Sequence, residues 1–224
     1  MKRVGFVVAM ESEYAPFLFR LGSLVREELR CGVGFALYTS DGAEIVLAKC
    51  GIGEIASSVA VGLLIGHYSC EYIVNFGLVG SLGSAQLSSI VAVKDVVHYD
   101  CDLTAFGHPL SAPADFSSAY FSSDPEMLSV LSARGIPSLR LASGDKFIAD
   151  VSLKTKLRDA FSADVCDMEG AGVAVACARA CVPFTMIKLV SDDAGEGAVS
   201  TFEQSKSKGF SFAVDVVFAV IKGV

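Results

Sequence analysis

The chain has 224 residues, of which 52% are hydrophobic and 19% are charged, and its formal net charge is -7. This composition excludes a disordered chain and is sufficient for the core of a single α/β domain spanning residues 1–224. The acidic balance argues against a nucleic-acid partner, because phosphate binding needs clustered Lys and Arg. Apolar runs near both ends are interrupted by charged side chains, so we expect neither a signal peptide nor a membrane span.

The seven cysteines favour a reduced, cytoplasmic protein. Their number is odd and no pair has Cys-x-x-Cys spacing, which argues against a disulfide framework. Cys177 and Cys181 share a helix face, but no histidine lies near them in the sequence to complete a metal site. We therefore assign this pair to the core and expect neither a metal nor a cofactor.

The first half of the chain alternates between apolar strands and helices. A strand at 4–9 is followed by a helix that we expect Ser12 to cap, with Pro16 in its first turn. Asp41-Gly42 is typical of the tight turn in a β-hairpin. The other elements expected here are strand 35–40, strand 44–49, helix 55–68, strand 72–76, a glycine-broken turn at 77–81 and strand 90–98.

A long segment, 100–121, separates the two halves of the chain. It contains Pro109, Pro113 and many Ser and Ala residues, and we predict a functional loop. Ser200 to Glu203 has the pattern of a capping box, which predicts the start of the last helix. The elements expected between these segments are helix 124–133, strand 139–142, helix 152–161, strand 163–166, helix 170–181 and strand 183–190.

This alternation predicts an α/β fold with three layers, α/β/α, around a mixed, mostly parallel central sheet. In such folds ligands collect at the carboxyl ends of parallel strands. Glu13 follows the first strand, Glu169 directly precedes a helix of small residues, and Asp192 closes a strand. Taken singly, Glu13 is better explained as an acid in a first helical turn, and Asp192 as part of a cap for the next helix. Together the three acids predict a site that protonates a leaving group and holds a cation-like sugar.

The segment that follows strand 139–142 is a candidate base-binding segment. Phe147 and Ile148 provide an aromatic ring and a branched aliphatic side chain, which suit the flat apolar face of a base, although Phe147 is equally explained as core. The glycines at 51, 53, 77 and 80 match neither a dinucleotide-binding fingerprint nor a Walker A loop. They are otherwise explained by tight turns.

Several motifs occur in a fixed order along nearly the whole chain. They are Ala9-Met10-Glu11-Ser12-Glu13, Gly51-Ile52-Gly53, Asn75-Phe76-Gly77, Asp102-Leu103-Thr104-Ala105-Phe106-Gly107, Ser143-Gly144-Asp145-Lys146-Phe147-Ile148, Asp167-Met168-Glu169 and Ser191-Asp192. In combination they resemble the bacterial 5'-methylthioadenosine/S-adenosylhomocysteine nucleosidases of the nucleoside phosphorylase superfamily. The resemblance implies a nucleoside phosphorylase-like fold and hydrolysis of the N-glycosidic bond of 5'-methylthioadenosine and/or S-adenosylhomocysteine. The products would be adenine and a 5-thioribose.

The resemblance also implies roles for the acids. Asp192 would protonate or hydrogen-bond purine N7, oriented by Ser191, and burial must raise its pKa for this purpose. Glu13 would orient or deprotonate the attacking water, and Glu169 would hold the ribose hydroxyls and stabilise the sugar cation. The implied substrate contacts are Met168 under the ribose, Phe147 stacked on adenine and the Ile148 backbone at the adenine edge.

A homodimer is implied as well, with each site completed by the neighbouring subunit. Leu103, Phe106 and Pro113 match positions that reach across to the alkylthio group, and Ile52 with Phe202 matches the remaining apolar wall. A subunit interface would explain an apolar loop on a soluble chain.

Two departures from the family pattern affect the expected site. Leu78 replaces a polar residue near the ribose and the water, and Lys188 replaces an Arg. The sequence is also compatible with two functions other than that of a nucleosidase. One is a purine nucleoside phosphorylase, although an acidic Glu13 would repel phosphate. The other is a nucleoside-binding protein without catalysis on the same fold.

Overall fold

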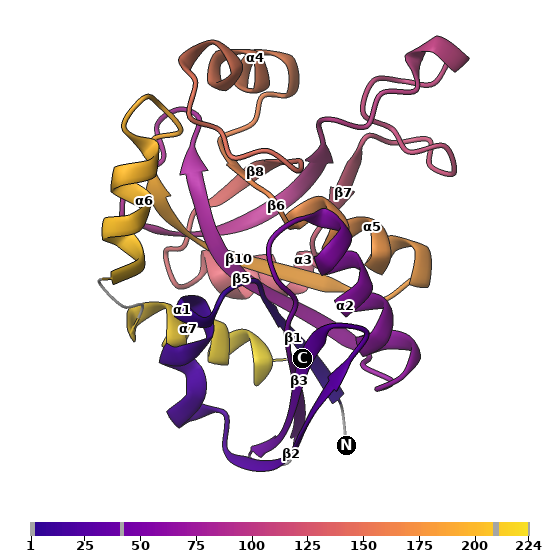
Figure 1. The fold of residues 1–224 in the computed structure, drawn as a ribbon, viewed down its shortest axis with the longest axis vertical. Helices are drawn as coiled ribbons and strands as arrows, with labels where there is room; N and C mark the ends of the chain where they lie inside the picture. The colour runs from indigo at the N-terminus through magenta and orange to yellow at the C-terminus, as the bar shows by residue number, and fades with distance from the viewer. Residues whose placement is uncertain (1–2, 41–42, 208–210, 224) are drawn as a thin grey trace.

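Apolar runs form the strands of one mixed sheet, which helices cover on both faces (Figure 1). The computed structural model describes residues 3–40, 43–207 and 211–223. The α/β class predicted from the sequence is confirmed. The strands are β1 (Arg3–Val8), β2 (Ser23–Arg30), β3 (Val33–Ser40), β4 (Ala43–Lys49), β5 (Tyr72–Ser81), β6 (Ile90–His98), β7 (Tyr120–Ser122), β8 (Ser138–Ser143), β9 (Val165–Asp167) and β10 (Phe184–Asp192).

Most of the helices share one of two cores with the sheet, and α4 contributes to a third, smaller core. The buried side chains of η1, α3 and α7 share one core with the sheet, and those of α2 and α5 share another core. Figure 1 shows α2 and α5 on one side of the strands and α1 and α7 on the other. The helices are α1 (Glu11–Tyr14), η1 (Ala15–Arg20), α2 (Glu54–Gly66), η2 (Thr104–Phe106), α3 (Pro125–Ser132), α4 (Val151–Phe161), α5 (Gly170–Ala180), α6 (Ala198–Ser207) and α7 (Ser211–Ile221).

Parallel pairs form the middle of the sheet, where β1 lies between β4 and β5, and β5 also pairs with β10. Antiparallel pairs extend it through β4, β3 and β2, and they also join β10 to β6, β5 to β9 and β6 to β7. Antiparallel pairing is therefore more frequent than the sequence suggested. Because β10 pairs with both β5 and β6, the strands β10, β6, β8, β9 and β5 close into a ring.

The carboxyl end of β5 is the point where this ring closes. Gly80 on β5 is the register partner of Asp192 on β10 and of Cys166 on β9. A Cβ at Gly80 would lie 2.9 Å from Asp192 Oδ1 and 3.2 Å from Cys166 Sγ. Glycine is therefore needed here to let three strands approach one another with their side chains in place.

The predicted turn at 77–81 is wrong, because β5 continues through Ser81. Gly77 would meet Glu13 Oε1 and Lys188 Nζ at 3.3 Å if it carried a Cβ. Both glycines thus make room for side chains of neighbouring elements and do not turn the chain.

The expected starts of the first and last helices are also wrong. The first helix begins at Glu11 with Met10 at its N-cap, and Glu13, rather than Ser12, accepts the Met10 N–H bond at 2.9 Å. At the other end, α6 begins at Ala198, so Ser200 to Glu203 lie inside it, and a separate helix α7 follows. Capping signals therefore located these helices only approximately.

The remaining predictions differ from the structure mainly at boundaries. The strands β3 and β4 pair antiparallel, with Ser40 opposite Ala43, while the predicted turn at Asp41-Gly42 lies outside the described residues. The segment 100–119 is a loop with one short helix, η2, and projects from the body of the molecule in Figure 1. Among the helices of the described residues, none has the length and apolar character required to cross a bilayer.

Candidate active site

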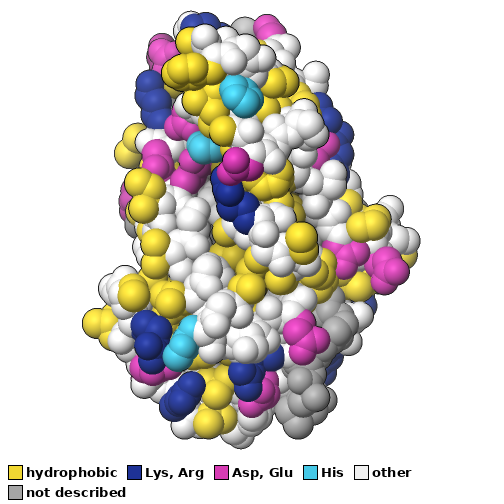
Figure 2. Space-filling model, turned by 90° about the vertical axis from the view of Figure 1, so that its right-hand side faces the viewer, with side chains coloured by type: hydrophobic (Ala, Val, Ile, Leu, Met, Phe, Trp, Pro, Cys, Tyr) yellow, Lys and Arg dark blue, Asp and Glu magenta, His cyan; other side chains and the backbone are white. Residues whose placement is uncertain are grey.

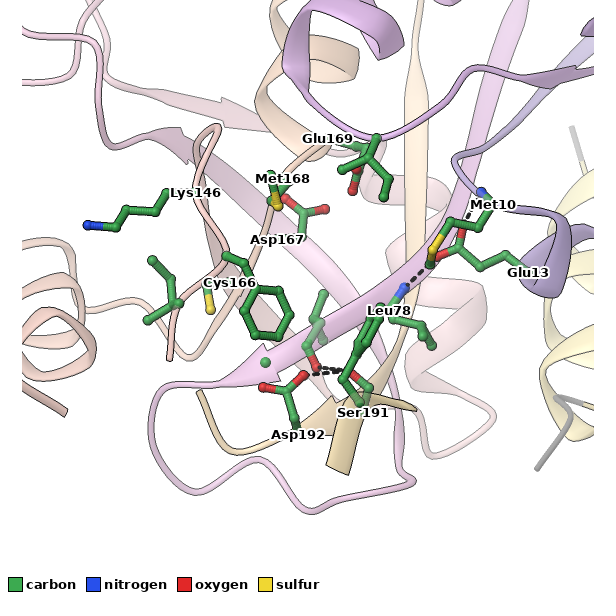
Figure 3. A pocket seen from close by; sticks show the side chains of 16 residues that line it. Met10, Glu13, Leu78, Lys146, Cys166, Asp167, Met168, Glu169, Ser191 and Asp192 are labelled. Atoms are coloured by element: carbon green, nitrogen blue, oxygen red, sulfur yellow. Dashed lines mark hydrogen bonds between the residues drawn. The ribbon is translucent and has the colours of Figure 1, made fainter. Parts of the chain in front are cut away.

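A cavity of about 300 Å³ opens where β5, β9 and β10 end. It combines the three predicted acids with most of the predicted substrate contacts (Figure 3). In Figure 3 the acids surround the cavity from three sides, with Glu169 above, Asp192 below and Glu13 at the right. The predicted residues that line it are Glu13, Ile52, Phe147, Ile148, Met168, Glu169, Ser191, Asp192 and Phe202.

Glu13 is held by backbone amides. Its Oε2 accepts hydrogen bonds from the N–H groups of Ala9 at 3.0 Å and Met10 at 2.9 Å, and its Oε1 accepts one from Leu78 at 3.1 Å. Burial raises the pKa of this carboxyl, against the opposing effects of the amides and of Lys188. Because burial outweighs these effects, the Glu13 carboxylate is a stronger base than an exposed one, and the amides fix its orientation.

Glu169 links the helix α5 to the loop before α2. It is the N-cap residue of α5, and its Oε1 accepts the Gly53 N–H bond at 2.9 Å. Burial, together with the negative charge of Asp167, raises the pKa of Glu169 to about 8. The side chain therefore retains its proton more readily than an ordinary glutamate, and a nearby positive charge would favour its ionised form.

Asp192 is buried at the end of β10, with 2% of its surface exposed. Its Oδ2 accepts a bond from the Ser191 hydroxyl at 2.7 Å, and its Oδ1 accepts one from the Ala194 N–H at 2.9 Å. Burial raises the pKa of Asp192 despite these bonds. A protonated, oriented carboxylic acid is what a purine leaving group requires.

A buried ion pair beside the acids was not assigned from the sequence. Lys188 Nζ lies 2.7 Å from Asp167 Oδ2, and Asp167 also accepts the Gly170 N–H bond. Burial lowers the pKa of Lys188, but the surrounding carboxylates, Asp167 first, outweigh this effect and raise it. Both residues stand in segments that drew attention in the sequence, yet only the structure shows that they pair.

Leu78, which the sequence placed near the ribose and the water, also lines the cavity. The lining residues to which the sequence assigned no role are Met10, Val79, Gly80, Lys146, Cys166 and Asp167. Leu78 contributes an apolar side chain, while its backbone N–H binds Glu13. The Lys146 side chain points away from the other labelled groups in Figure 3. Its ammonium is therefore not directed at the acids.

The aromatic wall consists of Phe147 and Phe202, whose rings meet edge to face with centroids 5.5 Å apart. Ile148 is buried beside them, whereas Phe147 is 39% exposed and Ile52 is 59% exposed. The partly exposed rings leave an apolar surface available to a flat ligand.

Three predicted contacts do not line the cavity of the single chain. Phe106 lies in the projecting loop and is 82% exposed, and Leu103 is half-buried in the same loop. Pro113 is buried within its own chain. Exposed apolar side chains also occur on α2, at Ile55 and Val59, and Figure 2 shows apolar side chains over this face of the molecule.

A family model described as the phosphorylase superfamily matches residues 3–222. The chain belongs to the phosphorylase superfamily. An aminodeoxyfutalosine nucleosidase of Campylobacter jejuni is 31% identical over 214 residues, which cover 91% of each chain. A 5'-methylthioadenosine/S-adenosylhomocysteine nucleosidase of Shewanella denitrificans is also 31% identical, over 230 residues and 98% of each chain.

Solved structures of nucleosidases also have the same fold as this chain. An S-adenosylhomocysteine nucleosidase from Streptococcus pyogenes, in complex with 5-methylthiotubericidin, has a TM-score of 0.91 at 26% identity and covers 97% of this chain and 96% of its own. A futalosine hydrolase of Helicobacter pylori has a TM-score of 0.93 at 25% identity and covers 100% and 98%. The predicted family and its fold are confirmed, and this member of the superfamily is an enzyme of the nucleosidase class.

Proposed function

We propose that this protein hydrolyses the N-glycosidic bond of 5'-methylthioadenosine and/or S-adenosylhomocysteine, releasing adenine and a 5-thioribose product. The observation that carries this proposal is the convergence of Glu13, Glu169 and Asp192 on one cavity, each with a raised pKa. The relatives named for these two nucleosides match nearly the whole chain and support the choice.

Asp192 acts on the base in this account. An unprotonated purine is a poor leaving group, and donation of a proton to it supplies about 10²–10⁴-fold in rate. Burial keeps Asp192 protonated to higher pH than an exposed aspartic acid, and Ser191 fixes its orientation. Phe147 stacks on the base, and Ile148 meets the base edge through its backbone.

Glu169 and Glu13 act on the sugar and the water. As the glycosidic bond breaks, positive charge develops on the ribose, and a carboxylate beside it stabilises that charge. Glu169 provides this carboxylate and holds the ribose hydroxyls, with Met168 beneath the ring. Glu13 orients the attacking water and accepts its proton, and Lys188 supports the ionised form of Glu13.

The 5' substituent occupies an apolar part of the site. Ile52 and Phe202 form its wall within one chain. Leu103 and Phe106 contribute from the neighbouring subunit of a homodimer, while the same role for Pro113, which its own chain buries, rests on the family resemblance alone. The exposed loop and the exposed apolar side chains of α2 support this arrangement, because a subunit interface would cover them. We also propose that the enzyme is cytoplasmic, on the basis of its cysteine content.

Aminodeoxyfutalosine is a second candidate substrate, because a relative of similar identity is named for it. Phosphorolysis is disfavoured by the charges at the site. Among the described residues that line the cavity, Lys146 is the only cation, and the buried Lys188 is paired with Asp167. A phosphate ion would therefore meet mainly carboxylates.

The test is a panel of purine nucleosides incubated with the purified protein, with and without phosphate. The panel contains 5'-methylthioadenosine, S-adenosylhomocysteine, aminodeoxyfutalosine, adenosine and deoxyadenosine, and chromatography identifies the base and sugar released. We expect adenine from the thioether nucleosides at rates that do not depend on phosphate. Strict dependence on phosphate, or no turnover of any nucleoside, would reject the proposal.

A further inference from the structure

A second cluster of titratable side chains lies outside the cavity, where the first turn of α2 meets the end of β6. His98 Nε2 lies 2.7 Å from Glu54 Oε2 and 2.9 Å from Asp100 Oδ1. One ligand atom from each of the three side chains lies within 4.8 Å of the others. Figure 2 shows histidine and acidic side chains close together on the face to which α2 and the loop 100–119 contribute.

Glu54 has an oxygen that the protein leaves unsatisfied. The residue is 7% exposed, and its Oε1 has no hydrogen-bond partner among the described residues. A buried carboxylate oxygen without a partner is costly, because it has lost its water and gained no donor. This oxygen belongs to the same carboxylate whose Oε2 faces His98, and a cation that the carboxylate binds through both oxygens would satisfy it.

The charges of the cluster do not balance. Asp145 brings a third carboxylate, which accepts the Glu54 N–H bond at 2.7 Å, and its own N–H donates to Asp100 Oδ2 at 3.1 Å. Two carboxylates contact the imidazole of His98, and a third lies next to them at Asp145, so even a protonated His98 leaves the group negative. A divalent cation would neutralise the charges of Glu54 and Asp100, while the Asp145 backbone N–H orients the Asp100 carboxylate.

We propose that Glu54, His98 and Asp100 form a binding site for a divalent transition metal such as zinc. Zinc binds imidazole and carboxylate ligands at about 2.0–2.2 Å, which places tetrahedral ligand atoms roughly 3.4 Å apart. The spacings of 2.7 and 2.9 Å at His98 need to widen by about 0.5–0.7 Å to reach this geometry. The imidazole favours zinc, cobalt or nickel over magnesium and calcium, which prefer oxygen ligands.

The metal would act on structure and not on the substrate. Glu54 directly follows Gly53, whose N–H binds Glu169 in the cavity. Asp100 stands at the start of the loop that contains η2. A bound ion would therefore tie the first turn of α2, and with it the Gly53 amide, to the end of β6 and the start of the loop.

The test uses cobalt(II), whose visible absorption reports tetrahedral coordination, added to the metal-free protein with both exposed cysteines changed to serine (Cys31→Ser and Cys181→Ser). We expect one cobalt per chain, displaced by zinc, without the near-ultraviolet band that thiolate ligands give. In the same background, His98→Gln and Asp100→Asn each remove a ligand and should weaken cobalt binding by more than about 100-fold. Replacing a residue that only hydrogen-bonds to a ligand typically costs about 10–100-fold. His108→Gln, on the neighbouring loop, is the matched control and should leave binding unchanged.

Circular dichroism and thermal melting establish that each variant is folded. Asp100 is more exposed than Glu54, so a ligand can be removed without replacing a buried residue. Cobalt that binds equally well to His98→Gln and Asp100→Asn would overturn the site. Absence of any stoichiometric binding to the parent protein would overturn it too. Neither result affects the proposed nucleosidase activity, which the nucleoside panel tests separately.

Discussion

The ammonium of Lys188 lies 2.7 Å from the carboxylate of Asp167, and both side chains are 1% exposed. The pair lies beside the acids of the cavity, and its two members shift the pKa values of those acids in opposite directions. Lys188 favours the ionised forms of Glu13 and Glu169, whereas Asp167 raises the pKa of Glu169. This ion pair therefore links the stability of the fold to the ionisation of the site.

Replacing Lys188 with Met should destabilise the protein by about 3–5 kcal/mol, because the change leaves Asp167 buried without its partner. Urea denaturation measures the free energy of unfolding. The control is Asp159→Asn, which removes one member of the exposed Arg158–Asp159 pair and should change stability far less. Equal effects of the two substitutions would contradict the importance assigned to the buried pair.

Glu169 should make the stability of the ligand-free protein depend on pH. Its pKa is about 8 in the folded protein, against an ordinary value of 4.5. A raised folded-state pKa gives a contribution to stability that is full below about pH 4.5 and is lost as the pH rises through about 8. Glu169→Gln should therefore show a smaller loss of stability across this window than the wild type.

Urea unfolding at a series of pH values measures that difference. Glu196→Gln, at an exposed position on the loop after β10, is the control and should keep the wild-type pH profile. An unchanged profile in Glu169→Gln would show that another group is responsible.

Asp192→Asn should bind nucleoside analogues yet lose about 10²–10⁴-fold in turnover, because the amide cannot protonate the leaving base. Steady-state kinetics and analogue titration separate the two effects. The neighbouring Asp193 is exposed, and Asp193→Asn provides a control that should keep wild-type turnover. Wild-type turnover in Asp192→Asn would remove this residue from the proposed mechanism.

Gly80→Ala should lower both stability and activity. The added methyl would lie 2.9 Å from Asp192 Oδ1 and 3.2 Å from Cys166 Sγ, so the strands or the acid must move. Overpacking of this kind typically costs about 1–3 kcal/mol. Gly62→Ala on α2 meets no atom within 4 Å and should be neutral or slightly stabilising. Thermal melting and turnover of the two variants compare the positions, and equal behaviour would contradict the close approach at Gly80.

The sequence predicted the main elements and the acids of the site because strong local signals mark both. Apolar runs located most strands, and the motifs around Glu13, Glu169 and Asp192 placed each acid at an element end. The strand β2 was missed because its side chains are mostly exposed and carry no apolar alternation. The glycines of β5 were interpreted as a turn, because glycine usually ends a strand.

Long-range pairing could not be derived from local patterns. Lys188 and Asp167 are on different strands, and their contact depends on how β10 and β9 flank β5. The contacts of Leu103, Phe106 and Pro113 with a substrate remain predictions, because they require a second copy of the chain.

The central claim is that this cavity directs water, and not phosphate, to the anomeric carbon of a purine nucleoside. Hydrolysis in water labelled with ¹⁸O, analysed by mass spectrometry of the products, tests it most directly. The account predicts one ¹⁸O in the released sugar, none in the base, and the same result when unlabelled phosphate is present. Recovery of a sugar phosphate, or of a sugar without the label, would contradict it.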